Sequence, residues 1–90
     1  MSAEILIIDD NSDIREILND LIIEAGYSTR LAANYNQALS EIDKKLPDVA
    51  IIDVKLDKGD NDGIELLNHI KNKNKNIPVI IISGHANINM

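Results

Sequence analysis

The chain alternates between short apolar runs and longer segments in which apolar residues recur every three or four positions. Three runs are continuous and of strand length: Glu4–Ile8, Asp48–Asp53 and Ile77–Ile82. Because they lack the apolar-polar alternation of a half-exposed strand, they predict strands buried on both faces, as in a parallel sheet. A fourth segment, Tyr27–Ala33, has β-branched and small residues without helical period and predicts a short edge strand.

The segment after the first run predicts an amphipathic helix. Asn11 or Ser12 is suited to cap its start, and Gly26 is suited to end it. Its apolar residues have i, i+3, i+4 spacing, which places them on one helical face. They are Ile14, Ile17, Leu18, Leu21, Ile22 and Ala25.

Two further helices are predicted from caps as well as from spacing. One follows Asn34, where Gln37 completes a variant of the capping box, and it closes before Pro47. The other follows Asp62, whose spacing to Glu65 is that of a capping box. Its apolar face consists of Leu66, Leu67 and Ile70.

The order strand, helix, strand, helix, strand, helix, strand predicts an α/β fold with right-handed crossovers. We expect one domain over residues 1–90, built as a doubly wound parallel sheet of the flavodoxin-like order. In that order the first and third strands are neighbours, and function lies beyond the carboxyl ends of the strands, where the order reverses.

Acidic residues stand at the ends of two of these strands. Asp9 and Asp10 follow the first strand and Asp53 ends the third, so the three carboxylates would share one crevice. Each pair of carboxylates 4 Å apart costs about 1 to 4 kcal/mol, so the cluster predicts a bound cation. Oxygen ligands without nearby His or Cys favour Mg²⁺. Taken singly, Asp9 or Asp10 could instead be a turn former or a helix cap.

A magnesium site beside a strand-end carboxylate indicates phosphoryl transfer. Asp53 is then the nucleophile that attacks phosphorus and forms an acyl phosphate. Ser83 ends the strand predicted to flank the third, where its hydroxyl could bond a phosphoryl oxygen. Taken alone, Ser83 fits a local turn or capping role better.

Composition argues against several other classes of function. The net charge of -6 opposes binding to nucleic acid or to an anionic membrane. The absence of cysteine excludes a disulfide framework, a thiolate nucleophile and a zinc-thiolate site. With no signal segment at its start and no apolar run near the ~20 residues of a membrane span, the chain is expected to be soluble and cytoplasmic.

A series of short motifs runs through nearly the whole chain. They are Ile-Leu-Ile-Ile-Asp-Asp at 5–10, Ala25-Gly26-Tyr27, Asn36-Gln37-Ala38-Leu39, Pro47-Asp48-Val49, Asp53, Asp62-Gly63-Ile64-Glu65-Leu66-Leu67, Ile77-Pro78-Val79-Ile80 and Ser83-Gly84. In this order and spacing the chain resembles a response-regulator receiver domain, the phosphoacceptor half of two-component signalling. Ser83-Gly84-His85 and the long loop after Asp53 are similar to receivers of nitrogen-regulation-type transcription factors.

The resemblance implies a role for each candidate residue. Asp53 would be the phosphoacceptor, and Asp9, Asp10 and Asp53 with the carbonyl of Lys55 would hold Mg²⁺. Ser83 would be the switch hydroxyl. The donor would be the phosphohistidine of a histidine kinase, and the chemistry would extend at most to self-phosphorylation and dephosphorylation.

The family fold continues beyond the elements predicted here, through a fourth helix, a fifth strand with a lysine that contacts the phosphoryl group, and a fifth helix. We therefore expect an incomplete receiver that labels slowly on Asp53. Without a fifth strand, Ile77–Ile82 would be an apolar edge, which predicts self-association. The alternative is a non-catalytic fragment that only docks on a kinase. A flavin-binding domain of the same topology fits less well, because no Ser/Thr/Gly-rich loop follows the first strand.

Overall fold

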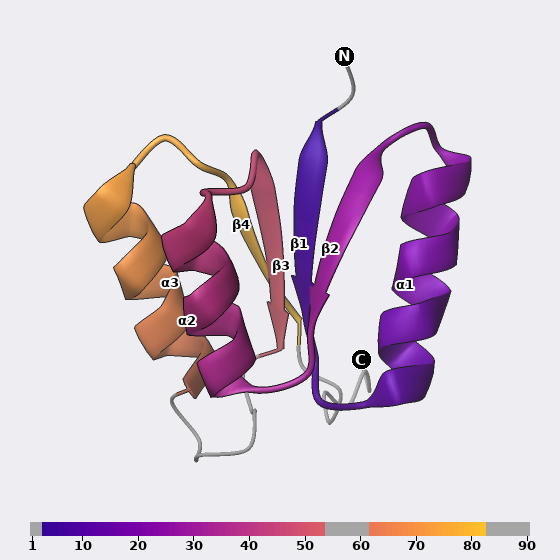
Figure 1. Ribbon diagram of the computed structural model, residues 1–90, viewed down its shortest axis with the longest axis horizontal. Helices are drawn as coiled ribbons and strands as arrows, with labels where there is room; N and C mark the ends of the chain where they lie inside the picture. Colours follow the sequence, from indigo (N-terminus) through magenta and orange to yellow (C-terminus); the bar gives the residue numbers. More distant parts are fainter. Residues whose placement is uncertain (1–2, 54–61, 83–90) are drawn as a thin grey trace, which may run out of the picture.

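The fold is an open sheet of four parallel strands with helices beside it (Figure 1). The computed structural model describes residues 3–53 and 62–82. Its elements are β1 (Glu4–Ile8), α1 (Ser12–Glu24), β2 (Ser28–Ala32), α2 (Tyr35–Lys44), β3 (Val49–Asp53), α3 (Asp62–Lys73) and β4 (Val79–Ile82). The strand order is β2-β1-β3-β4, and every neighbouring pair is parallel. The predicted flavodoxin-like order, with the first and third strands adjacent, is confirmed.

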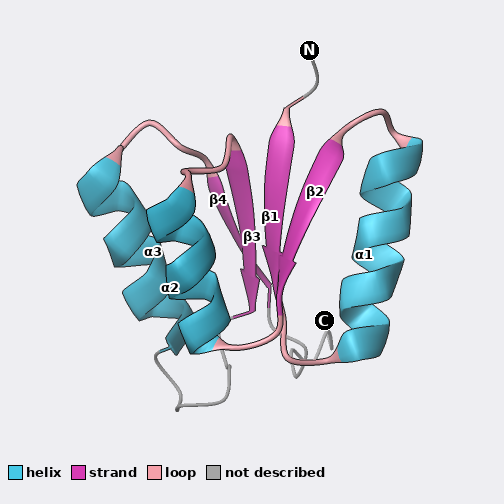
Figure 2. Cartoon of the chain, in the orientation of Figure 1, coloured by secondary structure: helices cyan, strands magenta, loops and turns pink. Residues whose placement is uncertain are grey.

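Helices cover both faces of the sheet, with α1 on one face and α2 and α3 on the other (Figures 1 and 2). Side chains of β1 alternate between the two: Leu6 and Ile8 join the core under α2 and α3, whereas Ile5 and Ile7 join the core under α1. Both faces therefore require apolar residues, which is why the run is continuous. Each buried Leu or Ile stabilises the fold by about 1.5 to 3 kcal/mol.

Three strands are shorter than predicted. β2 loses one residue at each end, β3 begins one residue after Asp48, and β4 begins two residues after Ile77. Pro78 has no N–H to give to the ladder, and the N–H of Ile77 bonds within the preceding turn. Asp48 instead supports the start of β1, because its carboxylate accepts a hydrogen bond from the N–H of Glu4 at 2.7 Å.

Side-chain caps fix the ends of the first two helices. Asn11, rather than Ser12, caps α1, and its Oδ1 accepts hydrogen bonds from two N–H groups of the first turn. Gly26 follows the helix with a φ of 102°, a conformation that favours glycine, as predicted. Asn34 caps α2 by accepting the N–H of Gln37 at 2.8 Å. The Gln37 side chain accepts from the residue before the cap rather than from the cap itself.

Helix α3 is confirmed, although its start differs from the prediction. Asp62 is the first residue of the helix rather than its cap. Glu65, the other half of the predicted capping box, accepts a hydrogen bond from the hydroxyl of Tyr35 at 3.2 Å. This contact joins α3 to α2 instead of capping α3.

The apolar stripe of α1 is wider than the surface that buries it. Leu18 and Ile22 pack against the sheet, but Ile17 and Leu21 are each more than half exposed. The helix lies over β1 and β2, so it meets only half of the sheet. No helix in the described ranges is both long and apolar enough to span a membrane.

Arg30 fastens β2 to the end of α2 and to the start of β1. Its Nη1 donates to the main-chain oxygen of Glu41 at 2.9 Å and to the Glu41 carboxylate at 3.0 Å, and its Nη2 donates to the carbonyl of Lys45 at 2.6 Å. Its Nε lies 3.1 Å from Glu4 Oε1, in an ion pair without hydrogen-bond geometry. Hydrogen bonds from Lys44 and Arg30 hold the pKa of Glu41 below its usual value of 4.5.

We expect Arg30→Met to lower the free energy of unfolding by about 2 kcal/mol, because two carboxylates and two helix-end carbonyls lose a largely buried donor. The urea midpoint measured by circular dichroism checks this. The part that depends on ionised Glu41 should persist above pH 4.5 and be lost as the pH falls through the lowered pKa.

Lys44→Met is the matched control for this substitution. Lys44 bonds the same carboxylate at 3.1 Å but is mostly exposed, so its removal should cost no more than about 0.5 kcal/mol. Equal losses for the two variants would show that Arg30 does not hold the end of α2.

Candidate functional site

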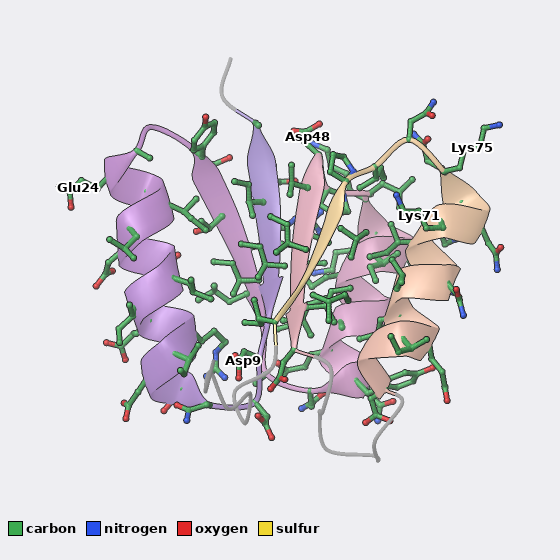
Figure 3. The ribbon with its side chains drawn as sticks, turned by 180° about the vertical axis from the view of Figure 1, so that it is seen from behind. Asp9, Glu24, Asp48, Lys71 and Lys75 are labelled. Carbon is green, nitrogen blue, oxygen red and sulfur yellow. The ribbon has the colours of Figure 1, made fainter. Side chains whose placement is uncertain are left out.

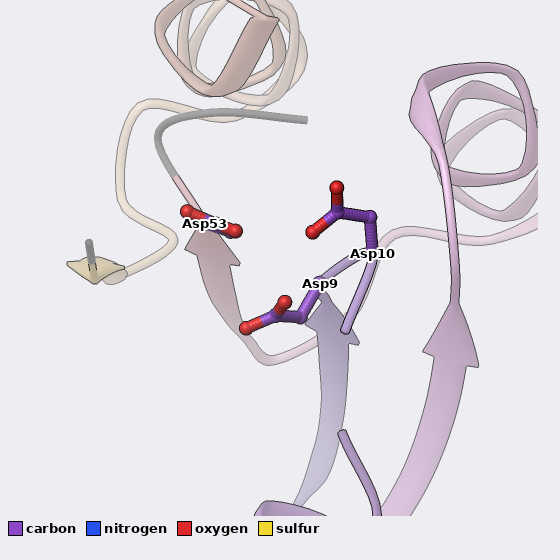
Figure 4. A group of neighbouring side chains, drawn as sticks. All are labelled: Asp9, Asp10 and Asp53. Atoms are coloured by element: carbon purple, nitrogen blue, oxygen red, sulfur yellow. The ribbon is translucent and has the colours of Figure 1, made fainter. Parts of the chain in front are cut away.

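Three acidic residues meet at the carboxyl ends of β1 and β3. The register places Ile8 beside Ile52, so Asp9 and Asp53 are the next residues along each strand. Each of Asp9, Asp10 and Asp53 offers an oxygen, and these oxygens all lie within 4.8 Å of one another. In Figure 4 the carboxylates of Asp9 and Asp10 turn toward the end of β3, where Asp53 lies. The predicted convergence is confirmed.

The acids sit at an open edge of the sheet. Asp9 is 2% exposed and Asp53 is 6% exposed, whereas Asp10 is exposed. The described residues enclose no pocket around them. Figure 3 shows Asp9 at one end of the sheet and Asp48 at the opposite end, so Asp48 is not part of the site.

Local hydrogen bonds hold Asp9 at the strand end. Its N–H donates to the carbonyl of Ala32 at 3.1 Å. Its Oδ1 accepts the N–H of Asn11 at 2.9 Å, and its main-chain oxygen accepts Arg15 Nη1 at 2.7 Å. Asn11 and Arg15 were not predicted as site residues, and the only sequence signal for either is its position in the turn or helix that follows Asp9.

Burial raises the pKa of Asp9 above its usual value of 3.8, and the nearby carboxylates of Asp53 and Asp10 raise it further. The hydrogen bond from the N–H of Asn11 favours the ionised form and opposes this rise in pKa. A cation among the acids would relieve their repulsion. The donor set consists of carboxylate oxygens, which suits a hard ion such as Mg²⁺.

Two of the predicted site residues, Lys55 and Ser83, lie outside the residues that the structure describes. Their roles therefore stay predictions. The described part of the site consists of Asp9, Asp10 and Asp53, with Asn11 and Arg15 around Asp9.

Known proteins share both the sequence and the fold of this chain. The family model described as "Response regulator receiver domain" matches residues 5–90. The nitrogen assimilation regulatory protein NtrX of Azorhizobium caulinodans is 40% identical over 88 residues, which cover 98% of this chain and 19% of that protein. The sporulation initiation phosphotransferase F of Bacillus subtilis is 40% identical over 90 residues, which cover 100% of this chain and 71% of that protein.

Two solved structures show the same arrangement of elements. The receiver domain of NtrX from Brucella abortus is 37% identical with a TM-score of 0.81, and the match covers 93% of this chain and 70% of that one. A CheY-like receiver domain protein from Methanospirillum hungatei JF-1 is 26% identical with a TM-score of 0.86, covering 98% of this chain and 69% of that one.

These findings bear out the resemblance to response-regulator receivers, including receivers of the nitrogen-regulation type. The chain spans about a fifth of the NtrX relative, so that protein's other activities do not transfer to it. The family match extends through all four strands and includes the three acids at the strand ends. The chain therefore belongs to the response regulator receiver domain family of two-component systems.

Proposed function

We propose that this chain is a phosphoacceptor module that takes a phosphoryl group from a histidine kinase onto Asp53, with Mg²⁺ held by Asp9, Asp10 and Asp53. The observation that carries the proposal is the convergence of these three carboxylates, with oxygens within 4.8 Å of one another. A relative covered over most of its length is named a phosphotransferase, which supports the same chemistry.

Each step of the transfer can be assigned to a group of this chain or of the donor. A carboxylate oxygen of Asp53 attacks phosphorus, an O–P bond forms, and the P–N bond to the donor histidine breaks. The electron pair of the broken bond leaves with the imidazole. Bound Mg²⁺ would offset the charge of the phosphoryl oxygens beside the carboxylates.

Asp53 is the better nucleophile by its position. It ends β3, whereas the carboxylate of Asp9 already accepts a hydrogen bond from Asn11. The proposal also includes Lys55 as a carbonyl ligand, Ser83 as a hydroxyl donor to the phosphoryl group, and a cytoplasmic location.

We expect millimolar Mg²⁺ to raise the melting temperature of this chain. A ligand that binds only the folded state, at ten times its Kd, adds about 1.4 kcal/mol, or about 5 to 10 °C for a domain of this size. Differential scanning calorimetry with Mg²⁺ and with EDTA measures the shift.

Asp10→Ala is the informative variant for this experiment. Asp10 is exposed, so its removal should leave the fold intact while it abolishes the shift. A wild-type melting temperature that Mg²⁺ does not move would exclude the magnesium site.

We expect a small phosphodonor with Mg²⁺ to add one phosphoryl group, on Asp53 alone. Intact mass before and after hydroxylamine checks this, because hydroxylamine cleaves acyl phosphates. Asp53→Asn should abolish the label, and a hydroxylamine-sensitive label that persists in that variant would contradict the assignment. A chain that binds Mg²⁺ but takes no label would favour the non-catalytic alternative, a fragment that only docks on a kinase.

We further propose that a second copy of this chain pairs along β4. Within the described residues β4 pairs with β3 on one side only. Its four residues, Val79–Ile82, carry no charge, and Ile80 and Ile81 are 51% and 38% exposed. Natural edge strands usually carry charge that blocks such pairing.

We expect light scattering after size exclusion to show a mass above the 10.0 kDa of one chain at tens of micromolar. Ile80→Lys should return the chain to a monomer, because it places a charge on the pairing edge. Leu31→Lys is the matched control, since Leu31 is 42% exposed on the opposite edge strand. A monodisperse wild-type monomer would refute pairing along β4.

A further inference from the structure

Arg15 reaches from the first turns of α1 back to the end of β1. Its Nη1 donates to the main-chain oxygen of Asp9 at 2.7 Å, and the contact is partly buried. The ladders of β1 end at Ile8, so the sheet itself supplies no partner for this carbonyl. The guanidinium therefore fixes the backbone at the residue whose carboxylate is the most buried of the three acids.

This contact completes the set of bonds that hold Asp9. The N–H bonds Ala32, Oδ1 bonds Asn11, and the carbonyl bonds Arg15. Asn11 in turn caps α1, the helix that carries Arg15. The strand end, the turn and the helix start thus form one closed set of hydrogen bonds around Asp9.

We propose that Arg15 is a positioning residue for cation binding, which acts by holding Asp9 in the place where its carboxylate serves the metal. This inference rests on the proposed function. A partner that supports a metal ligand without touching the metal commonly changes metal affinity by 10- to 100-fold.

Two other effects of Arg15 make different predictions. Its positive charge would repel an incoming cation, so removal of the charge would tighten binding. A purely structural role would lower the stability of the fold and leave the cation affinity unchanged. The sign and size of the change in affinity therefore separate the three explanations.

The experiment is a calorimetric titration with MgCl₂ of the wild type, Arg15→Met and Arg15→Lys, each well below its melting temperature. We expect Arg15→Met to weaken Mg²⁺ binding about tenfold, the lower end of the range for such partners, because the bond is to the backbone of Asp9 rather than to its carboxylate. Lysine can still donate one hydrogen bond to a carbonyl, so Arg15→Lys should recover most of the affinity.

Arg30→Met is the matched control, because Arg30 also donates to main-chain carbonyls but contacts Glu4 and Glu41 rather than the acid cluster. It should lower stability without changing the Kd for Mg²⁺. If Arg15→Met fails to fold, Arg15→Gln replaces it, since the shorter glutamine cannot reach Asp9.

A second measurement needs no metal. Hydrogen exchange of the Asn11 N–H, which donates to Asp9 Oδ1, should be faster in Arg15→Met than in the wild type and unchanged in Arg30→Met. Unchanged or tighter Mg²⁺ binding by Arg15→Met would overturn the inference. A wild type that binds no Mg²⁺ would instead overturn the proposed function itself.

Discussion

The pairing of β1 with β3 is the constraint on which the site depends. With Ile8 beside Ile52, the residues that follow along each strand are brought to one edge of the sheet. Asp9 and Asp53 cannot separate without breaking the ladder that buries these two isoleucines. The acids are therefore close because the apolar strands require it, even though the carboxylates repel one another.

Folding pays for this repulsion with apolar burial. Each carboxylate pair costs about 1 to 4 kcal/mol at 4 Å, while each fully buried Leu or Ile contributes about 1.5 to 3 kcal/mol. The core under α2 and α3 contains several such residues with almost no exposure, among them Leu6, Ile8 and Ile52. The raised pKa of Asp9, caused first by burial, is the electrostatic sign of the same conflict. A fold with a dry core can keep three acids together until a cation binds.

The strands and the acid cluster could be predicted because they follow from short-range patterns. A continuous apolar run indicates burial on both faces, and an acid at its end indicates the edge of a parallel sheet. The strand ends near Asp48 and Pro78 were misplaced because they depend on individual hydrogen bonds. The exposure of Ile17 was missed because periodicity gives the direction of a helical face and not the amount of sheet that covers it.

The roles of Arg15 and Arg30 could not be predicted for a different reason. A long, flexible side chain can reach many acceptors, and only the tertiary arrangement decides which one it meets. Arg15 bonds the carbonyl of Asp9, and Arg30 bonds the end of α2 and pairs with Glu4. Sequence spacing contains no signal for contacts of this kind. Lys55 and Ser83 lie outside the described residues, so their roles still rest on the family resemblance.

These two arginines hold β1 at both of its ends. Arg30 pairs with Glu4, where the strand begins, and Arg15 bonds Asp9, just after the strand ends. β1 also has a paired strand on each side, whereas β4 pairs on one side only among the described residues. The acids of β1 are therefore ordered by folding itself, before any cation arrives. Because the ordering cost of Asp9 is met during folding, a cation that binds there does not have to meet it again, and its affinity is higher for that reason.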